Sequence, residues 1–224
     1  MMSQALVERA VGRSRAAACS EALKWVGLAC MVVDHLGRFA SVPVPGWQSI
    51  GRFAFPCFGV ALASQVPACR LRVVGLRLLV VGLGVVPLQS LVVGHVVLSV
   101  LFTLGLGLFV ADALSGCVTA EGAVVLAGSF VASLFVEYGS GGVLLVAGGW
   151  LSYSLRRQLL GFSMLCVAFA LLVRRGGAFV GLPLAAVLLY CYSPGVVVPR
   201  ARHAFIWFYI LQWPALLLLQ RVPL

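Results

Sequence analysis

The chain is a series of long apolar runs that short polar segments interrupt. A helix needs about 20 residues, and at least about 17, to cross the roughly 30 Å hydrocarbon core of a bilayer. By that measure we expect nine helices, at residues 22–39, 49–66, 72–91, 94–114, 120–136, 139–155, 158–173, 177–192 and 203–220. Several of the later runs are short, so counts of eight and ten stay open. The runs are continuous and do not alternate, which argues against a barrel. The pattern predicts an all-α, polytopic transmembrane helical bundle.

Composition supports this reading. Hydrophobic residues make up 62% of the 224 positions and charged residues only 10%, whereas a soluble domain has about 25% charged residues. The chain lacks the polar surface that a water-facing globule needs, so we expect a multi-pass protein embedded in the lipid bilayer. Residues 1–21 read as a cytoplasmic N-terminal tail, and residues 22–224 read as a single transmembrane helical domain.

The formal net charge is +10. The arginines come in pairs between apolar runs, which is the flanking pattern of a polytopic membrane protein rather than a face for nucleic acid. We therefore expect no nucleic acid partner. Their distribution favours a cytoplasmic N-terminus, although the pair Arg174–Arg175 opposes it.

Cysteine and glycine patterns exclude other classes of site. The seven cysteines are scattered, mostly within apolar runs and with no CxxC pair, so we expect neither a disulfide framework nor a metal site. The 25 glycines include no GxxxxGK phosphate loop. They are expected to serve close helix packing.

The stretch MVVDHLGRFA, residues 31–40, places three ionisable groups at the end of an apolar run. A charge at the centre of a membrane helix costs roughly 2.5–3.5 kcal/mol, so such residues are treated first as functional. Arg38 is four residues from Asp34 and three from His35, so it reaches either side chain. Asp34 and His35 point roughly 100° apart, so Asp34 does not orient His35. Glu137 or a substrate would have to do so. A neutral histidine can act as a general base near pH 7.

Lys24 lies eleven residues before His35, which is about three helical turns and about 16 Å on one face. Such a face could line a cleft for an elongated anionic molecule. In the alternative reading, Lys24 reaches the lipid headgroups.

Other polar residues lie near the ends of the predicted helices. His95 and Glu137 fall at helix boundaries. His203 lies beside Arg200 and Arg202. These three residues could bind phosphate groups. They could also simply reflect the excess of basic residues that membrane proteins carry in their cytoplasmic loops. The aromatic residues Trp207, Tyr209 and Trp213 are interpreted as an interfacial belt.

Five segments resemble the TraX family of conjugative-plasmid membrane proteins. They are ALKWVGLACMVVDHLGRF, IGRFAFPCFGVALA, VLFTLGLGLFVAD, VEYGSGGVLLVAGGWL and FIWFYILQWPALLLL, and the agreement covers about residues 22–155 and the last helix. That family includes the acetylase of F pilin. The resemblance implies a bacterial inner membrane protein of a conjugation (type IV secretion) system, with pilin as partner and acetyl-CoA as donor. The matching motifs imply that the functional candidates are Asp34, His35, Arg52, Phe55 and Pro56. Ser99 stands where the family leads us to expect an asparagine.

A fainter likeness exists to the type-three membrane acyltransferases, whose first helix carries a basic residue, ten intervening residues and a histidine. Lys24 and His35 have this spacing. Lysine keeps the charge of the usual arginine but loses its bidentate grip on phosphate.

The leading hypothesis is a membrane-bound N-acyltransferase that acetylates the N-terminal amine of pilin. In this hypothesis His35 accepts the amine's proton, Arg38 or Arg52 stabilises the oxyanion, and Asp34 holds Arg38. Glu137 completes the set of catalytic candidates. The phosphates of acetyl-CoA would meet a set of basic residues, namely Lys24, Arg70, Arg72, Arg200, Arg202 and His203.

Two alternatives stay open. One is pilin cyclisation by transpeptidation, as in broad-host-range conjugation systems that carry a TraX-like pilin-maturation protein. It would need Ser64, Ser99 or Cys57 as nucleophile. The other is a non-catalytic membrane chaperone for pilin or a small transporter, in which the polar residues hold helices together or line a substrate path.

Overall fold

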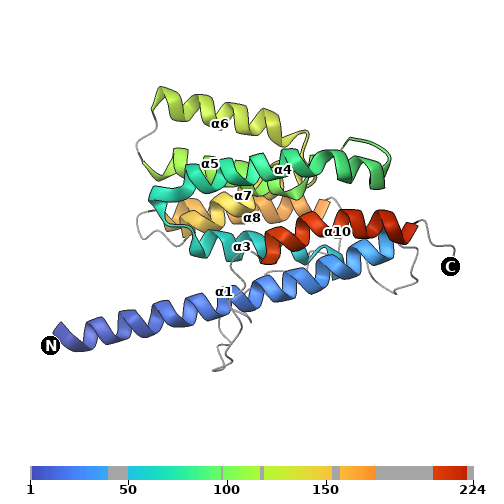
Figure 1. Cartoon of the computed structure of the whole chain (residues 1–224). Coiled ribbons are helices and arrows are strands. Elements are labelled where there is room, and N and C mark those ends of the chain that lie inside the picture. Colours follow the sequence, from blue (N-terminus) through green and yellow to red (C-terminus); the bar gives the residue numbers. More distant parts are fainter. Residues whose placement is uncertain are drawn as a thin grey trace.

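Helices make up the regular structure of the described residues, which are 2–39, 50–96, 98–116, 119–152, 157–174 and 204–220 of a computed structural model. They are α1 (Met2–Phe39), α3 (Ala54–Gln65), α4 (Leu71–Val93), α5 (Val100–Ser115), α6 (Ala120–Ser133), α7 (Gly139–Ser152), α8 (Gln158–Arg174) and α10 (Ala204–Gln220), with a 3₁₀ turn at Ala68–Arg70 (Figure 1). A parallel bridge pairs Leu98 with Val136. The all-α prediction is confirmed.

The predicted number of nine spans is not confirmed. The range 177–192 lies outside the described residues. By length and composition, one described helical segment, Ala68–Val93, could cross a membrane, and six other apolar helices are shorter. The twelve residues of α3 measure only about 18 Å along the axis.

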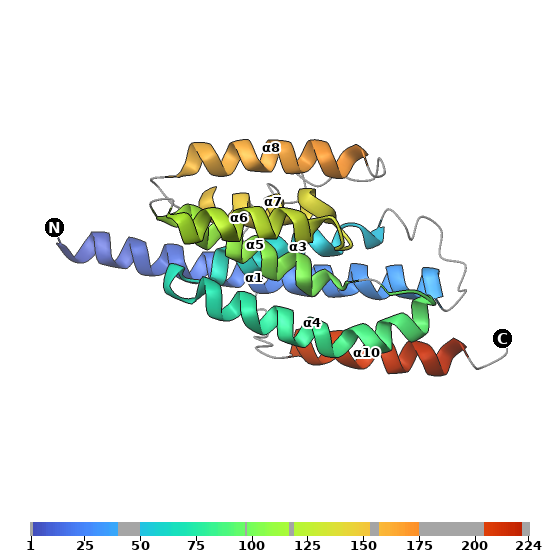
Figure 2. The same ribbon diagram turned by 90° about the horizontal axis from the view of Figure 1, so that it is seen from above.

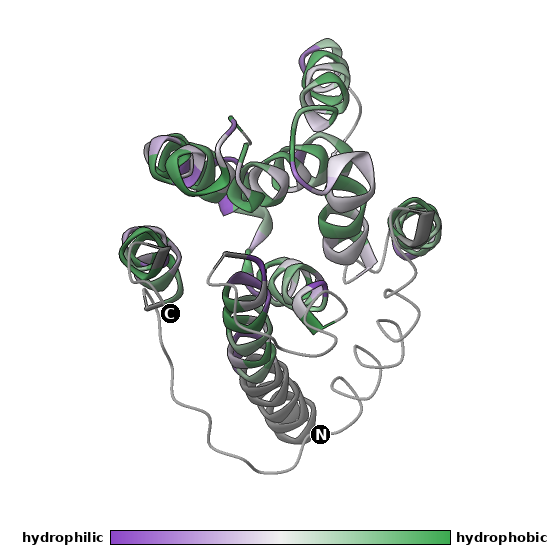
Figure 3. Ribbon diagram, turned by 90° about the vertical axis from the view of Figure 1, so that its right-hand side faces the viewer, coloured by the Kyte–Doolittle hydropathy of each residue, from purple (hydrophilic) through white to green (hydrophobic). Residues whose placement is uncertain are grey.

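The outer surface of the bundle is nevertheless apolar. Large hydrophobic side chains are exposed on several helices, among them Leu91 at 68%, Val124 at 72% and Leu159 at 83%. In Figure 3 hydrophobic colouring dominates the outward sides of the described helices. Such an architecture is consistent with a membrane protein, since water would not favour a surface of this kind.

The first helix is longer than the expected span. α1 begins at Met2, so the segment interpreted as a tail is helical. Its five alanines favour that conformation. The placement of residues 1–21 relative to the membrane stays a prediction.

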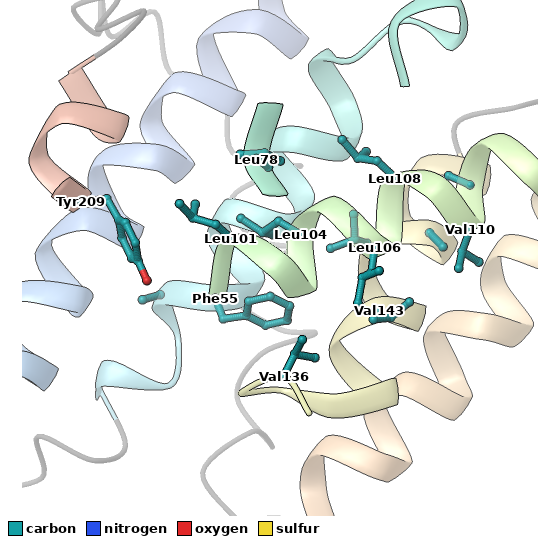
Figure 4. Close-up of a cluster of buried hydrophobic side chains, with 14 of the residues drawn as sticks. Phe55, Leu78, Leu101, Leu104, Leu106, Leu108, Val110, Val136, Val143 and Tyr209 are labelled. Atoms are coloured by element: carbon teal, nitrogen blue, oxygen red, sulfur yellow. The ribbon is translucent and has the colours of Figure 1, made fainter. Parts of the chain in front are cut away.

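Glycines allow the central helices to approach closely. A Cβ added at Gly107 of α5 would lie 2.5 Å from Cβ of Val146 on α7, and one at Gly142 of α7 would lie 2.6 Å from Cγ2 of Thr103 on α5. Real side chains do not tolerate such distances, so these contacts require glycine. Figure 4 shows the resulting core, in which Phe55 of α3, leucines of α5 and Val143 of α7 belong to one buried cluster.

The packing also brings the two ends of the sequence together. α10 contacts α1 and α4, while α3 contacts α1 and α7. Figure 1 shows α10 beside the end of α1, although their residues are far apart in the chain, and Figure 2 shows α10 alongside α4. Side chains from α1, α4 and α10 can therefore share one site.

We predict that Gly107→Ala destabilises the fold. The new methyl group overlaps Val146, and overpacking of this kind typically costs about 1–3 kcal/mol. The matched control is Gly84→Ala on α4, where an added Cβ meets nothing within 4 Å. Thermal unfolding in detergent should show a lower midpoint for Gly107→Ala only. Equal midpoints for the two variants would contradict the close packing of α5 on α7.

Candidate functional site

A cavity of about 290 Å³ at one end of the bundle is lined by polar side chains from several elements. α1 contributes Asp34, His35 and Arg38, α4 contributes Gln89, and the connection between α6 and α7 contributes Glu137. The remaining wall is largely aromatic and apolar, and it includes Phe55, Phe58, Tyr138, Tyr209 and Trp213. We call this space the reaction cavity. The reaction cavity is large enough to hold a small chemical group of a ligand beside the polar side chains that would bind it.

His35 is held by the last described helix. Its Nδ1 lies 2.8 Å from Oε1 of Gln212, a residue 177 positions away. The ring of Trp213 lies beside the imidazole, with 5.1 Å between the ring centroids. Because a carboxamide oxygen can only accept, Nδ1 donates the hydrogen bond. Nε2 then keeps its lone pair and is the atom of His35 that can take a proton.

Arg38 lies between two carboxylates. Its Nη2 is 3.7 Å from Oδ1 of Asp34, and its Nη1 is 4.0 Å from Oε1 of Glu137. The expected pairing of Asp34 with Arg38 at i,i+4 is therefore confirmed. Asp34 and Glu137 thus place two carboxyl groups at the wall of the cavity, where their oxygens can accept hydrogen bonds from an ammonium group.

Two contacts fix the positions of these carboxylates. Gly51 packs against Asp34 so closely that an added Cβ would overlap the carboxylate. Phe55 stacks on Tyr138 with 4.0 Å between ring centroids and 13° between planes, and Tyr138 adjoins Glu137 in the chain. Of the motif residues expected to act here, Phe55 lines the reaction cavity, whereas Arg52 and Pro56 do not.

A second cavity of about 250 Å³ adjoins the first. The two share Met31, Phe58, Val100 and Tyr209 as lining residues. Lys24 lines the second cavity, so Lys24 and His35 lie on two adjoining cavities rather than in one cleft. The second cavity is mostly apolar, with Lys24 and Gln65 as its polar residues.

Lys24 already has partners. Its Nζ donates to Oε1 of Glu21 at 2.7 Å and to Oε1 of Gln65 at 2.6 Å. It also lies 5.9 Å from the ring centroid of Phe205. A phosphate at Lys24 would have to compete with the carboxylate of Glu21.

The other basic candidates lie away from the reaction cavity or outside the described residues. Arg72 is exposed and donates to Asp112 and to Glu121, which ties α4 to α5 and α6. Arg70 is exposed in the 3₁₀ turn that precedes α4. Arg200, Arg202 and His203 lie outside the described residues. His95 is exposed and lines the reaction cavity.

The candidate nucleophiles of the cyclisation hypothesis do not line the reaction cavity. Ser64 donates its hydroxyl to the carbonyl of Ala61 at 2.9 Å, and Ser99 and Cys57 are buried elsewhere in the core. Among the described residues there is no cluster of three metal-ligating side chains.

Several cavity residues were not singled out from the sequence as functional. They are Gln89, Tyr138, Tyr209 and Trp213. Gln212, which contacts His35 from α10, was not singled out either. The belt interpretation is wrong for Tyr209 and Trp213, which are 6% and 2% exposed, whereas Trp207 is 60% exposed. The spacing of residues 209, 212 and 213 at three and four positions was a usable signal, because it places all three on one helix face.

Comparison with known families decides the assignment. The model of the family described as TraX protein matches residues 19–220, nearly the whole chain. The chain belongs to the TraX family. Membership in the TraX family implies a role in the processing of conjugative pilin. A search of curated proteins and a search of solved structures each found no match.

We predict that Gln212→Leu changes the tautomer of His35. Without the carboxamide oxygen, Nδ1 loses its acceptor and the Nε2–H form gains population. Nitrogen-15 NMR of histidine-labelled protein should show His35 as the Nδ1–H tautomer in the wild type and as a mixture in the variant. His35→Ala assigns the signal. An unchanged His35 spectrum in Gln212→Leu would contradict the hydrogen bond between α1 and α10.

Proposed function

We propose that this TraX-family protein is an inner-membrane N-acyltransferase that moves an acetyl group from acetyl-CoA to the N-terminal amine of pilin. The observation that carries the proposal is His35, held by Gln212 at Nδ1 and lining a cavity with two carboxylates and one guanidinium. A base and a charged lining of this kind suit transfer of an acyl group to an amine.

The carboxyl groups of the reaction cavity would bind the acceptor. An N-terminal amine has a pKa near 7.7–8.0, so most of it is an ammonium ion at neutral pH. Asp34 and Glu137 offer that ion two carboxylates, and the amine that reacts is the deprotonated fraction beside His35. The membrane partner of this site is the pilin subunit, which would enter at the end of the bundle where α1 ends and α3 begins.

The reaction then needs one base and one oxyanion partner. The amine nitrogen attacks the thioester carbonyl, a C–N bond forms, and Nε2 of His35 takes the proton. Arg38 faces the developing oxyanion, since Arg38 lines the reaction cavity and Arg52 does not. The tetrahedral intermediate collapses as the C–S bond breaks. The proton on His35 passes to the thiolate, which leaves an N-acetylated pilin and a free CoA thiol.

The donor would use both cavities. The reaction cavity alone is too small for a whole coenzyme A, but it adjoins the apolar second cavity that ends at Lys24. The acetyl thioester would reach His35 through this space, and the phosphates would stay near Lys24 and Arg70. With the N-terminus in the cytoplasm, that end of the bundle faces the cytoplasmic supply of acetyl-CoA.

We predict that His35→Ala abolishes pilin acetylation in cells. Loss of the base typically costs two to four orders of magnitude in rate. Mass spectrometry of pilin should show one acetyl group with the wild type and none with the variant. Gln158→Ala, an exposed change at the start of α8, is the control and should keep the acetylated mass. Full acetylation with His35→Ala would contradict the role of His35. Loss of water from pilin in the wild type would instead indicate cyclisation.

A further inference from the structure

Gln89 is a buried polar residue that the proposed mechanism has not used. Gln89 is 4% exposed, and its side-chain oxygen Oε1 has no hydrogen-bond partner among the described residues. It lines the reaction cavity from α4, together with Asp34 and His35 from α1. A buried carboxamide oxygen that lacks a partner destabilises a protein, so its presence calls for an explanation.

Packing does not explain it. The buried face of α4 includes Leu78, Gly82, Val85, Gln89 and Val92, which follow one another at spacings of three and four residues. Every other member of this face is apolar, and an apolar side chain would suit position 89 equally well. The carboxamide is therefore best explained by a ligand that enters the cavity and carries a hydrogen-bond donor.

The proposed reaction supplies such a donor. A primary amine that has attacked a carbonyl carries two N–H groups. One N–H gives its proton to Nε2 of His35, and the other needs an acceptor in surroundings with little water. We infer that Oε1 of Gln89 accepts this second N–H and thereby makes Gln89 a specificity-determining residue for primary amines. The inference rests on the proposed function.

The number of N–H groups on the attacking amine decides whether Gln89 finds a donor. An N-methylated amine retains only one N–H after it attacks the same carbonyl. His35 takes that proton, and Gln89 is left facing a methyl group, so its oxygen stays unpaired. The site should therefore discriminate against N-methyl acceptors more strongly than the intrinsic chemistry of the two amines requires.

The test compares two acceptors in purified full-length protein in phospholipid vesicles with acetyl-CoA. One peptide begins with alanine, and the other has N-methylalanine at the same position. We expect the wild type to prefer the alanine peptide at least tenfold in kcat/KM. Gln89→Met, which is similar in length and cannot accept the hydrogen bond in the same way, should remove most of this preference by lowering kcat/KM for the alanine peptide. Gln89→Glu retains an acceptor oxygen and should keep more of the preference than Gln89→Met.

Stability measurements separate this role from a structural one. Gln89→Met removes an unpaired buried oxygen from an apolar face, so its unfolding midpoint should equal or exceed that of the wild type. Gln158→Met on the exposed start of α8 should change neither the preference nor the midpoint. An unchanged acceptor preference in Gln89→Met would overturn the inference and leave the transferase intact. A wild type that acetylates neither peptide would overturn the proposed function and the inference with it.

Discussion

The hydrogen bond between His35 and Gln212 is the contact on which the site depends. It joins α1 to α10 across 177 residues of sequence and fixes which nitrogen of the imidazole holds the proton. In apolar surroundings a polar side chain needs a partner, so this bond and the Arg38 contacts with Asp34 and Glu137 define how α1 is oriented. Without them the ionisable groups of α1 would face lipid or an empty cavity. The same pairings that allow these residues in the bundle also position them as the proposed transfer requires.

Local patterns predicted much of the fold. The apolar runs predicted helix positions close to those of α4, α7 and α8. Such a prediction needs only the composition of residues that are neighbours in the sequence. The Asp34–Arg38 pair was also predictable, since i,i+4 spacing alone brings two side chains together. The length of α1 was underestimated because residues 1–21 are polar enough to resemble a tail, although their helix propensity is high.

Long-range contacts could not be predicted in this way. Gln212 and Gln89 look like isolated polar residues in apolar helices. Only the packing of α1, α4 and α10 shows that Gln212 contacts His35 and that Gln89 lines the same cavity as His35. Tyr209 and Trp213 were misinterpreted because an aromatic residue in an apolar helix has the same sequence signature at an interface and in a core. Arg72 was considered a phosphate ligand, yet Asp112 and Glu121 engage it from α5 and α6. In each case the neighbours that decide the environment come from another helix.

The proposed transfer requires the imidazole of His35 to take the proton of the attacking amine inside the reaction cavity. Chemical rescue can test this step, because the space vacated in His35→Ala can admit free imidazole. Imidazole should restore acetyl transfer from labelled acetyl-CoA to an alanine peptide in vesicles with His35→Ala, and it should have no such effect on the wild type. Transfer at the wild-type rate by His35→Ala without imidazole would contradict it.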